Sequence, residues 1–343
     1  MAKILVTGGT GFIGSHTVVE LHNAGYEVVI IDDFSNSSPK ILKQIEAIIG
    51  IVPECVELDL CDEAKVNEFA AKHPDLTGVI HFAAFKAVGE SVQKPLEYYK
   101  NNFYSLINII NAYKRSLNLV FSSSCTVYGQ PDVLPVTEEA PTKKAESPYG
   151  NTKQIAEEIL QETCAVTPDL HVISLRYFNP VGAHSSALIG ELPIGVPQNL
   201  VPFITQSAIG KRGQITVFGN DYDTADGSAV RDYIHVVDLA KAHVAAIKRL
   251  ETAKADSNYE VFNLGTGKGS TVLEIVNAFE KSTGEKLNYA IGPRRSGDVE
   301  KVWGDVTKSA EVLGWTAELG VEDMMRSAWN WEKYLKDNPF YCV

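Results

Sequence analysis

A glycine-rich turn directly after the first strand constrains the fold of this chain most. The apolar, β-branched run Lys3–Thr7 leads into Gly8, Gly11 and Gly14, and a helical pattern begins at Phe12. Glycines permit the tight turn and let backbone amides approach a pyrophosphate, while the helix N-terminus adds partial positive charge. The turn therefore predicts a dinucleotide site at the start of the chain.

Short β-branched runs alternate with helical stretches after this turn. Several of the runs are apolar throughout, which predicts strands that are buried on both faces of a parallel sheet. We expect an α/β fold with a doubly wound parallel (Rossmann) sheet and an NAD-binding domain over residues 1–180. The predicted strands are Lys3–Thr7, Glu27–Ile31, Cys55–Leu58, Gly78–Phe82, Leu119–Ser122 and His171–Tyr177.

The composition and the hydrophobic periodicity of the chain change after Asn179-Pro180. Residues 183–230 are rich in Gly and Pro with few clear periods, so we expect a smaller, loop-rich substrate domain over residues 181–343. The strand-like run Tyr259–Leu264 predicts that segments near 230–265 return to the first domain. Gly265–Ser270 lacks the spacing of a phosphate loop, and we expect a turn followed by a helix that Thr271 and Glu274 cap.

Composition excludes several classes of function. The formal net charge is −12, which argues against a nucleic-acid partner, and no apolar run is long enough to span a membrane. The five cysteines form no CxxC pair and the eight histidines show no ligand spacing. We therefore expect reduced thiols, a cytoplasmic location and no metal site.

Two acids stand where a carboxylate would bind an adenosine ribose. The second predicted strand ends at Asp32 and Asp33, eighteen residues after Gly14. An acid at this point of a dinucleotide fold is placed to accept from the ribose hydroxyls, and two acids repel a 2′-phosphate. The pair favours NAD over NADP as the cofactor.

Tyr149 and Lys153 place a phenol and an ammonium one helical turn apart on the same helix face. Tyrosine titrates near 10, and bringing it to neutrality takes about three pKa units, or about 4 kcal/mol. A neighbouring ammonium and the charge of an oxidised nicotinamide together favour the phenolate. The pair therefore predicts proton transfer coupled to redox chemistry, with Lys153 also placed to hold the nicotinamide ribose.

A run of hydroxyls, Ser122-Ser123-Ser124, ends the strand Leu119–Ser122. In a fold of this kind the end of that strand faces the substrate, so its hydroxyls are candidates to contact a sugar oxygen. Cys125 follows them, but no step of such a reaction needs a covalent enzyme adduct, and we interpret Cys125 as a small side chain that fills space.

These motifs together resemble the extended short-chain dehydrogenase/reductase family, and the likeness extends over nearly the whole chain. The stretches that carry it are Val6–Gly14, His81–Ser91, Ser122–Gly129, Ser147–Lys153, Arg176–Pro180 and Val230–His235. The resemblance implies reversible epimerisation of UDP-galactose and UDP-glucose at C4 through a 4-keto intermediate and tightly bound NAD. It also implies a place in galactose metabolism.

The resemblance further implies roles for individual residues. Tyr149 is the expected acid–base for the sugar 4-hydroxyl, Ser124 the hydroxyl that bonds the same oxygen, and Lys153 the tuning ammonium. The implied cofactor shell is Gly8, Gly11, Phe12, Ile13, Gly14, Asp32, Asp33, Asn36, Ser37, Asp59, Leu60, Phe82, Ala83, Lys86, Asn101, Ser124, Tyr149, Lys153 and Phe178. The implied UDP-sugar contacts are Ser124, Tyr149, Asn179, Asn199, Leu200, Phe218, Arg231, Arg295, Asp298 and Val302.

Three rival functions share part of this pattern. Nucleotide-sugar 4,6-dehydratases carry an Asp-Glu pair after the strand-end threonine, whereas this chain has Ser124-Cys125-Thr126-Val127. An epimerase of uronic sugars needs a cationic pocket for the sugar carboxylate, and the sequence leaves that reading open. A regulator that senses a dinucleotide without catalytic activity has no need of Tyr149 and Lys153. Both residues are present, which argues against this function.

Val302 bears on sugar specificity, because the resemblance places it in the wall of the sugar pocket. A bulky tyrosine there restricts the site to plain hexoses, whereas a smaller side chain admits an N-acetyl group. We expect activity on UDP-N-acetylglucosamine as well as UDP-glucose, unless neighbouring loops close the pocket.

The segment Leu96–Arg115 is apolar around more of its helix than one core contact requires. The helix after Tyr149 also presents Ile155, Ile159 and Leu160. We expect a two-fold homodimer that pairs these helices, with deep burial inside one chain as the alternative.

Overall fold

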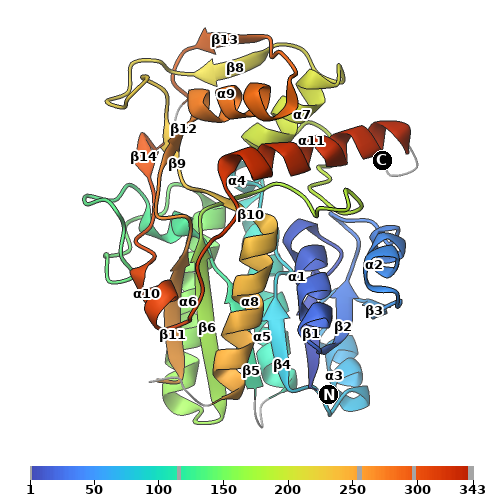
Figure 1. Cartoon of the computed structure of the whole chain (residues 1–343). Coiled ribbons are helices and arrows are strands. Elements are labelled where there is room, and N and C mark those ends of the chain that lie inside the picture. The colour runs from blue at the N-terminus through green and yellow to red at the C-terminus, as the bar shows by residue number, and fades with distance from the viewer. Residues whose placement is uncertain (1, 114–116, 253–256, 296–298, 339–343) are drawn as a thin grey trace.

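The computed structural model describes residues 2–113, 117–252, 257–295 and 299–338. In these residues seven parallel strands form one sheet in the order β11-β6-β5-β4-β1-β2-β3 (Figure 1). The order reverses beside β1, so a crevice opens at the carboxyl ends of the central strands, where ligands bind in folds of this type. The strands are β1 (Lys3–Thr7), β2 (Glu27–Asp32), β3 (Glu54–Glu57), β4 (Gly78–His81), β5 (Leu117–Ser122), β6 (Leu170–Tyr177) and β11 (Tyr259–Leu264).

Helices cover both faces of the sheet, which confirms the doubly wound class. One face packs against α1 (Phe12–Asn23), α2 (Ile41–Ile49) and α8 (Val236–Glu251); the other packs against α3 (Glu63–Lys72), α5 (Pro95–Ala112) and α6 (Pro148–Val166). In β1 the side chains of Ile4 and Val6 join the first core, and Leu5 joins the second. Burial on both faces explains why this strand is apolar at successive positions.

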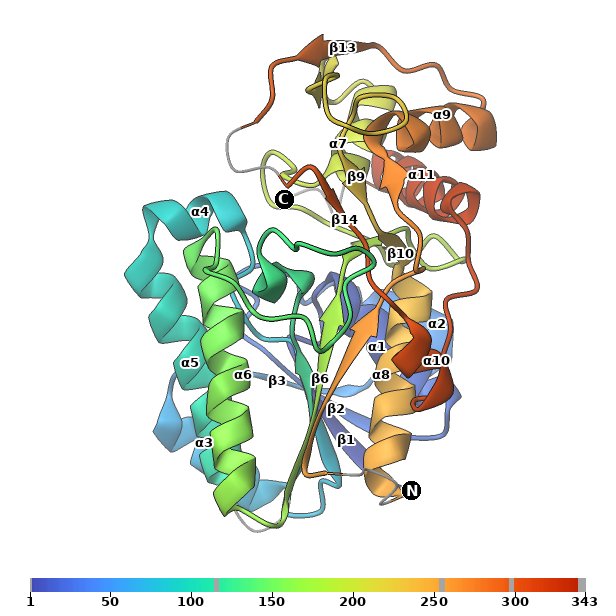
Figure 2. The same ribbon diagram turned by 90° about the vertical axis from the view of Figure 1, so that its left-hand side faces the viewer.

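A second, smaller layer of structure sits over the carboxyl ends of the strands (Figures 1 and 2). Its core packs α7, α9 and α11 around buried aromatic and methionine side chains such as Phe279, Met324 and Trp329. The elements are β7 (Asn179–Val181), α7 (Leu200–Ala208), β8 (Ile215–Phe218), β9 (Val230–Arg231), β10 (Tyr233–His235), β12 (Ser270–Thr271), α9 (Val272–Thr283), β13 (Tyr289–Gly292), β14 (Lys301–Val302) and α11 (Val321–Asp337). Three shorter helices are α4 (Val88–Gln93), the 3₁₀ turn η1 (Cys125–Tyr128) and α10 (Thr307–Glu311).

Two local predictions are confirmed at the junction of the layers. The run Tyr259–Leu264 forms β11, which pairs with β6 in the large sheet. The turn after it leads into α9, where the Thr271 hydroxyl accepts from the Glu274 N–H and the Glu274 carboxylate accepts from the Thr271 N–H. This reciprocal pair is a capping box, so Gly265–Ser270 is a turn into a capped helix.

None of the helices in the described ranges has both the length and the apolar character that a membrane crossing requires.

Candidate active site

The glycine turn lies between β1 and α1 and has no room for side chains. Gly8 has φ +68°, and a Cβ on Gly14 would lie 2.1 Å from the carbonyl oxygen of Gly8. Among the described residues no side chain caps α1 at Gly11, and its first turn holds no acid. The N–H groups at this helix end are therefore left for an anionic ligand, and the turn fits the pyrophosphate of a dinucleotide.

Asp32 is the last residue of β2, and its side chain stabilises the glycine turn through hydrogen bonds. Its carboxylate accepts from the Thr10 N–H at 3.0 Å, from the Ser37 hydroxyl at 2.8 Å and from the Phe34 N–H at 3.0 Å. A carboxylate has about four acceptor positions, so one position remains for a ribose hydroxyl. Asp33 is exposed beside it and accepts from Ser35. The two negative charges suit the 2′-hydroxyl of NAD and oppose a 2′-phosphate.

Most of the predicted cofactor residues follow the carboxyl ends of the strands β1 to β6, which share one edge of the sheet. A Cβ on Gly8 would lie 3.0 Å from the Ala83 nitrogen, so the segment after β4 packs on the glycine turn. Asn101 comes from α5, and its Oδ1 lies 3.7 Å from the Cys61 sulfur. The residues at this edge are Gly8, Gly11, Phe12, Ile13 and Gly14 after β1, Asp32, Asp33, Asn36 and Ser37 at β2, Asp59 and Leu60 after β3, Phe82, Ala83 and Lys86 after β4, Ser124 after β5 and Phe178 after β6.

Tyr149 and Lys153 lie on the first turns of α6, which begins at Pro148. The Ser147 hydroxyl caps this helix by accepting from the Gly150 N–H at 3.1 Å, and proline at the first position suits a helix start. The Lys153 ammonium lies 5.9 Å from the centre of the Tyr149 ring and 4.8 Å from that of Phe121. Phenol and ammonium thus share one face of the helix at the end of β5.

The Lys153 ammonium donates to the backbone oxygen of Ser122 at 2.6 Å. Burial lowers the pKa of Lys153 to about 8, and the charge of Glu157 opposes that fall. Burial raises the pKa of Tyr149 to about 12, and a hydrogen bond with Ser124 opposes that rise. Desolvation of the phenolate is the main cause of this rise, so Lys153 alone does not bring the pKa of the phenol toward neutrality.

The substrate side of the crevice comes from the smaller layer. Asn179 lies in β7 and Leu200 starts α7, while Asn199 donates to the Glu191 carboxylate at 2.8 Å. Burial raises the pKa of Glu191 and the charge of Lys86 opposes that rise, so Lys86 on the cofactor side faces Glu191. Glu191 belongs to no sequence motif and is found only through these contacts in the structure.

Two arginines and an aromatic ring belong to the same side. The guanidinium of Arg295 lies 5.8 Å from the centre of the Phe218 ring, which is 41% exposed at the end of β8. Arg231 in β9 pairs with Val302 in β14. Asp298, the remaining predicted contact, lies outside the described residues.

The catalytic segment and the substrate side meet at Cys125. Burial raises the pKa of the Cys125 thiol to about 12, and the charge of Arg231 opposes that rise. Cys125 packs against the buried cluster of Val127, Phe178 and Val302. A protonated, packed thiol is unreactive, which agrees with a role in filling space.

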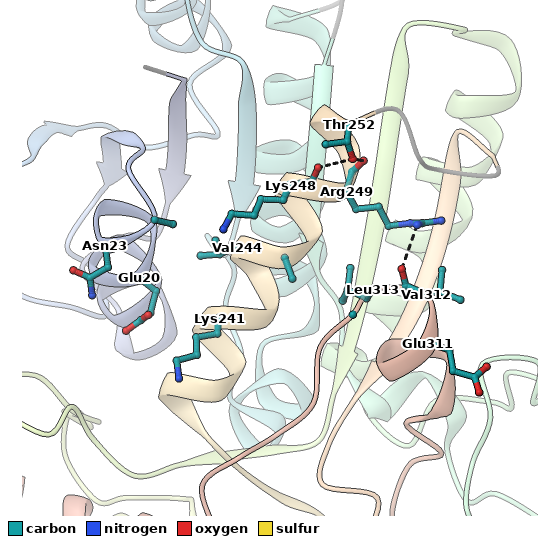
Figure 3. Close-up of a pocket in the computed structure, with 13 residues that line it drawn as sticks. Glu20, Asn23, Lys241, Val244, Lys248, Arg249, Thr252, Glu311, Val312 and Leu313 are labelled. Carbon is teal, nitrogen blue, oxygen red and sulfur yellow. Dashed lines mark hydrogen bonds between the residues drawn. The ribbon is translucent and has the colours of Figure 1, made fainter.

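A groove of about 670 Å³ lies elsewhere, between α1, α8 and the segment after α10 (Figure 3). Glu20, Lys241, Lys248 and Val312 line it, and Arg249 donates across it to the Val312 oxygen. None of the predicted site residues contributes to this groove. The chemistry is therefore assigned to the crevice at the strand ends.

Known proteins resemble this chain over almost its full length. The profile of the family described as GDP-mannose 4,6 dehydratase matches residues 5–328. A UDP-glucose 4-epimerase of Haemophilus influenzae is 50% identical over 338 residues, with 98% of each chain covered. Two solved structures are also similar to this chain.

The first solved structure is a UDP-glucose-4-epimerase from Stenotrophomonas maltophila with bound NAD and formylated UDP-arabinopyranose. It has a TM-score of 0.94 and 44% identity, with 98% of this chain and 100% of that chain covered. The second is a UDP-glucose 4-epimerase from Bifidobacterium longum in complex with NAD+ and UDP, with a TM-score of 0.91 and 46% identity over 98% of this chain and 99% of that chain.

Proposed function

Because this chain belongs to the UDP-glucose 4-epimerases of the NAD-dependent epimerase/dehydratase family, we propose that Tyr149, Ser124 and Lys153 carry its chemistry. The reaction is the reversible epimerisation of UDP-galactose and UDP-glucose at C4 with bound NAD, in galactose metabolism. The observation that supports these three residues is their convergence: α6 brings Tyr149 and Lys153 to the end of β5, where Ser124 lies beside the phenol.

The three residues have distinct parts in the proposed mechanism. Tyr149 takes the proton from the sugar 4-hydroxyl and later returns it, and Ser124 hydrogen-bonds the same oxygen. Lys153 supplies positive charge beside the phenol. NAD, when bound, would supply the acceptor for the C4 hydride and the donor for its return. Burial is the main cause that raises the pKa of Tyr149, so the positive charge of an oxidised nicotinamide would favour proton removal.

We propose that the tight contacts are made to the nucleotide end of the UDP-sugar, so that the 4-keto sugar is free to rotate within the site. Arg231 and Arg295 suit bidentate pairing with the diphosphate, and the exposed ring of Phe218 suits contact with the uracil. Asn179, Asn199 and Leu200 complete this end. Binding energy from the UDP then holds the reacting sugar in place.

Epimerisation is favoured over dehydration by the segment after Ser124. Elimination needs an acid pair beside the sugar, and η1, Cys125–Tyr128, contains no carboxylate. Conversion of UDP-galactose to UDP-glucose by the purified protein without added NAD tests this proposal. Release of water to a 4-keto-6-deoxy product would contradict it.

Val302 is proposed to leave room for an N-acetyl group. Its side chain is buried at the edge of the cluster with Phe178 and is much smaller than a tyrosine. We expect turnover of UDP-N-acetylglucosamine by the wild type, and Val302→Tyr is expected to reduce it at least about tenfold while changing UDP-galactose turnover less than about threefold. Steady-state kinetics on both sugars measure this. An inactive wild type on the acetylated sugar, beside full activity on UDP-galactose, would reject the proposal.

A homodimer through α5 and α6 is proposed, because these helices pack side by side and carry apolar groups outside the core. Tyr104 on α5 is 51% exposed, and Ile155 and Ile159 on α6 are half-buried. Light scattering is expected to give twice the chain mass of 37.5 kDa. A monomer at micromolar concentration would contradict the dimer.

We also propose a cytoplasmic location, since the four described cysteines are free thiols. For the domains, we propose residues 1–180 as the NAD-binding unit and residues 181–343 as the UDP-sugar unit, with β11 returning to the large sheet.

A further inference from the structure

Three consecutive serines at the end of β5 each have a partner on α6. The Ser122 backbone oxygen accepts from the Lys153 ammonium at 2.6 Å, and the Ser123 hydroxyl donates to the Glu157 carboxylate at 2.5 Å. Ser124 lies beside Tyr149 and opposes the rise in the pKa of that phenol. The three partners are spaced four residues apart, so they lie on one face of the helix. Two of them are proposed reactants, and Glu157 is the third.

Glu157 is held in place by a buried ion pair. Arg176 on β6 donates to it through Nε at 3.0 Å and through Nη2 at 2.6 Å, and both side chains are 8% exposed. The same guanidinium donates to the Tyr128 hydroxyl at 3.0 Å, and that hydroxyl donates to Asn263 on β11 at 2.7 Å. The carboxylate thus joins α6, the serine segment and two strands of the sheet.

We propose that Glu157 is a positioning residue for the epimerisation: held by Arg176, it fixes Ser123 and thereby sets Ser124 against Tyr149. This inference rests on the proposed roles of Tyr149 and Ser124. Glu157 itself touches no reacting atom, since its carboxylate is taken by Ser123 and Arg176. Its link to the reacting hydroxyl runs through Ser123, which is the chain neighbour of Ser124.

The same carboxylate acts on Lys153 through its charge. Lys153 is faced by Tyr149 and Glu157 on its own helix, by His81 on β4 and by the Phe121 ring on β5. On β6, Arg176 pairs with Glu157 and Tyr177 interacts electrostatically with Tyr149. Burial lowers the pKa of His81 to about 3, so at neutral pH it adds no charge. Glu157 is the group that raises the pKa of Lys153. Its loss lowers that pKa, and the ammonium then deprotonates at a lower pH.

Glu157→Gln in the holoenzyme tests the proposal, because glutamine keeps the shape and removes the charge. We expect kcat for UDP-galactose to fall about 10-fold to 100-fold, as for lost alignment of a general base, with KM changed less than about twofold. We also expect the alkaline limb of the kcat–pH profile to move down by about one pH unit. The amount of bound NAD is expected to stay the same.

Glu260→Gln is a matched control from the same sheet. Arg249 on α8 donates to Glu260 on β11 through Nε and Nη2, both at 2.8 Å, and this pair is as buried as the first. It lies away from the serine segment. We expect Glu260→Gln to lower thermal stability about as much as Glu157→Gln does, with kcat and its pH profile unchanged.

Two results would overturn the proposal. The first is an active Glu157→Gln enzyme with the kcat and the alkaline limb of the wild type. The second applies if Glu157→Gln does not fold: Ser123→Ala, which removes the link to Ser124, would then leave kcat unchanged instead of lowering it at constant KM. Failure of the proposed function is distinct, since it would appear as an inactive wild type or a fully active Tyr149→Phe enzyme.

Discussion

Tyr149→Phe is expected to reduce kcat for UDP-galactose about a thousandfold, within the range that a positioned acid–base contributes. The substitution removes one oxygen from a half-buried ring and leaves its packing in α6 unchanged. KM and NAD content are therefore expected to stay near those of the wild type. A coupled assay for UDP-glucose, with nicotinamide measured after denaturing extraction, gives both quantities.

Tyr289→Phe provides the control for this substitution. Tyr289 is 40% exposed on β13, away from the ends of the large sheet, and the same oxygen is removed there. We expect wild-type kinetics from it. A Tyr149→Phe enzyme with more than about a tenth of the wild-type kcat would remove Tyr149 from the role of acid–base, since such a group contributes at least about a hundredfold.

Gly14→Ala is expected to abolish NAD binding and with it the activity. The added Cβ would lie 2.1 Å from the Gly8 oxygen and 2.8 Å from the Gly9 Cα, both backbone atoms that no rotamer change can move. The turn must open, at a cost of about 3 kcal/mol, and the helix N-terminus is then displaced from the pyrophosphate. We expect no nicotinamide in the purified variant and a lower midpoint of thermal unfolding.

Gly213→Ala separates this steric effect from a general effect of losing glycine. A Cβ on Gly213 meets nothing within 4 Å, so we expect NAD content and stability close to the wild type. If Gly14→Ala retained stoichiometric NAD, the glycine turn would not be the pyrophosphate site.

Local signals made much of the fold predictable from the sequence. Continuous apolar runs marked the strands of the large sheet, and the structure differs from the expected bounds of these strands by at most two residues, as for β5, which begins at Leu117. The glycines of the turn after β1 were predictable because the tight turn leaves no room for side chains. The Thr271–Glu274 cap was predictable because both partners lie within one helical turn.

The short strands of the smaller layer were not predictable in this way. β9, β12 and β14 are two residues long each, and their pairing is decided by contacts between distant segments. No periodicity accumulates over two residues, so none of these three strands was predicted from the sequence.

The pKa shifts and ion-pair partners in the candidate site also could not be predicted from the sequence. Spacing places Lys153 beside Tyr149, but it does not show the burial of the phenol, which raises the pKa of Tyr149. The partner of Glu157 is Arg176, which lies on β6 and becomes a neighbour only when α6 packs on the sheet. The four-residue spacing of Tyr149, Lys153 and Glu157 was the available signal, and it identifies a helix face without its partners.

In the proposed mechanism the hydride leaves C4 of the sugar and returns to C4 of the same molecule through NAD that stays bound. The direct measurement uses the purified protein without added nicotinamide, and an equal mixture of UDP-galactose deuterated at C4 and UDP-galactose labelled only with ¹³C. Mass spectrometry of the UDP-glucose is expected to find deuterium retained and confined to the ¹²C molecules. Loss of deuterium to solvent, or its transfer to the ¹³C molecules, would contradict the account.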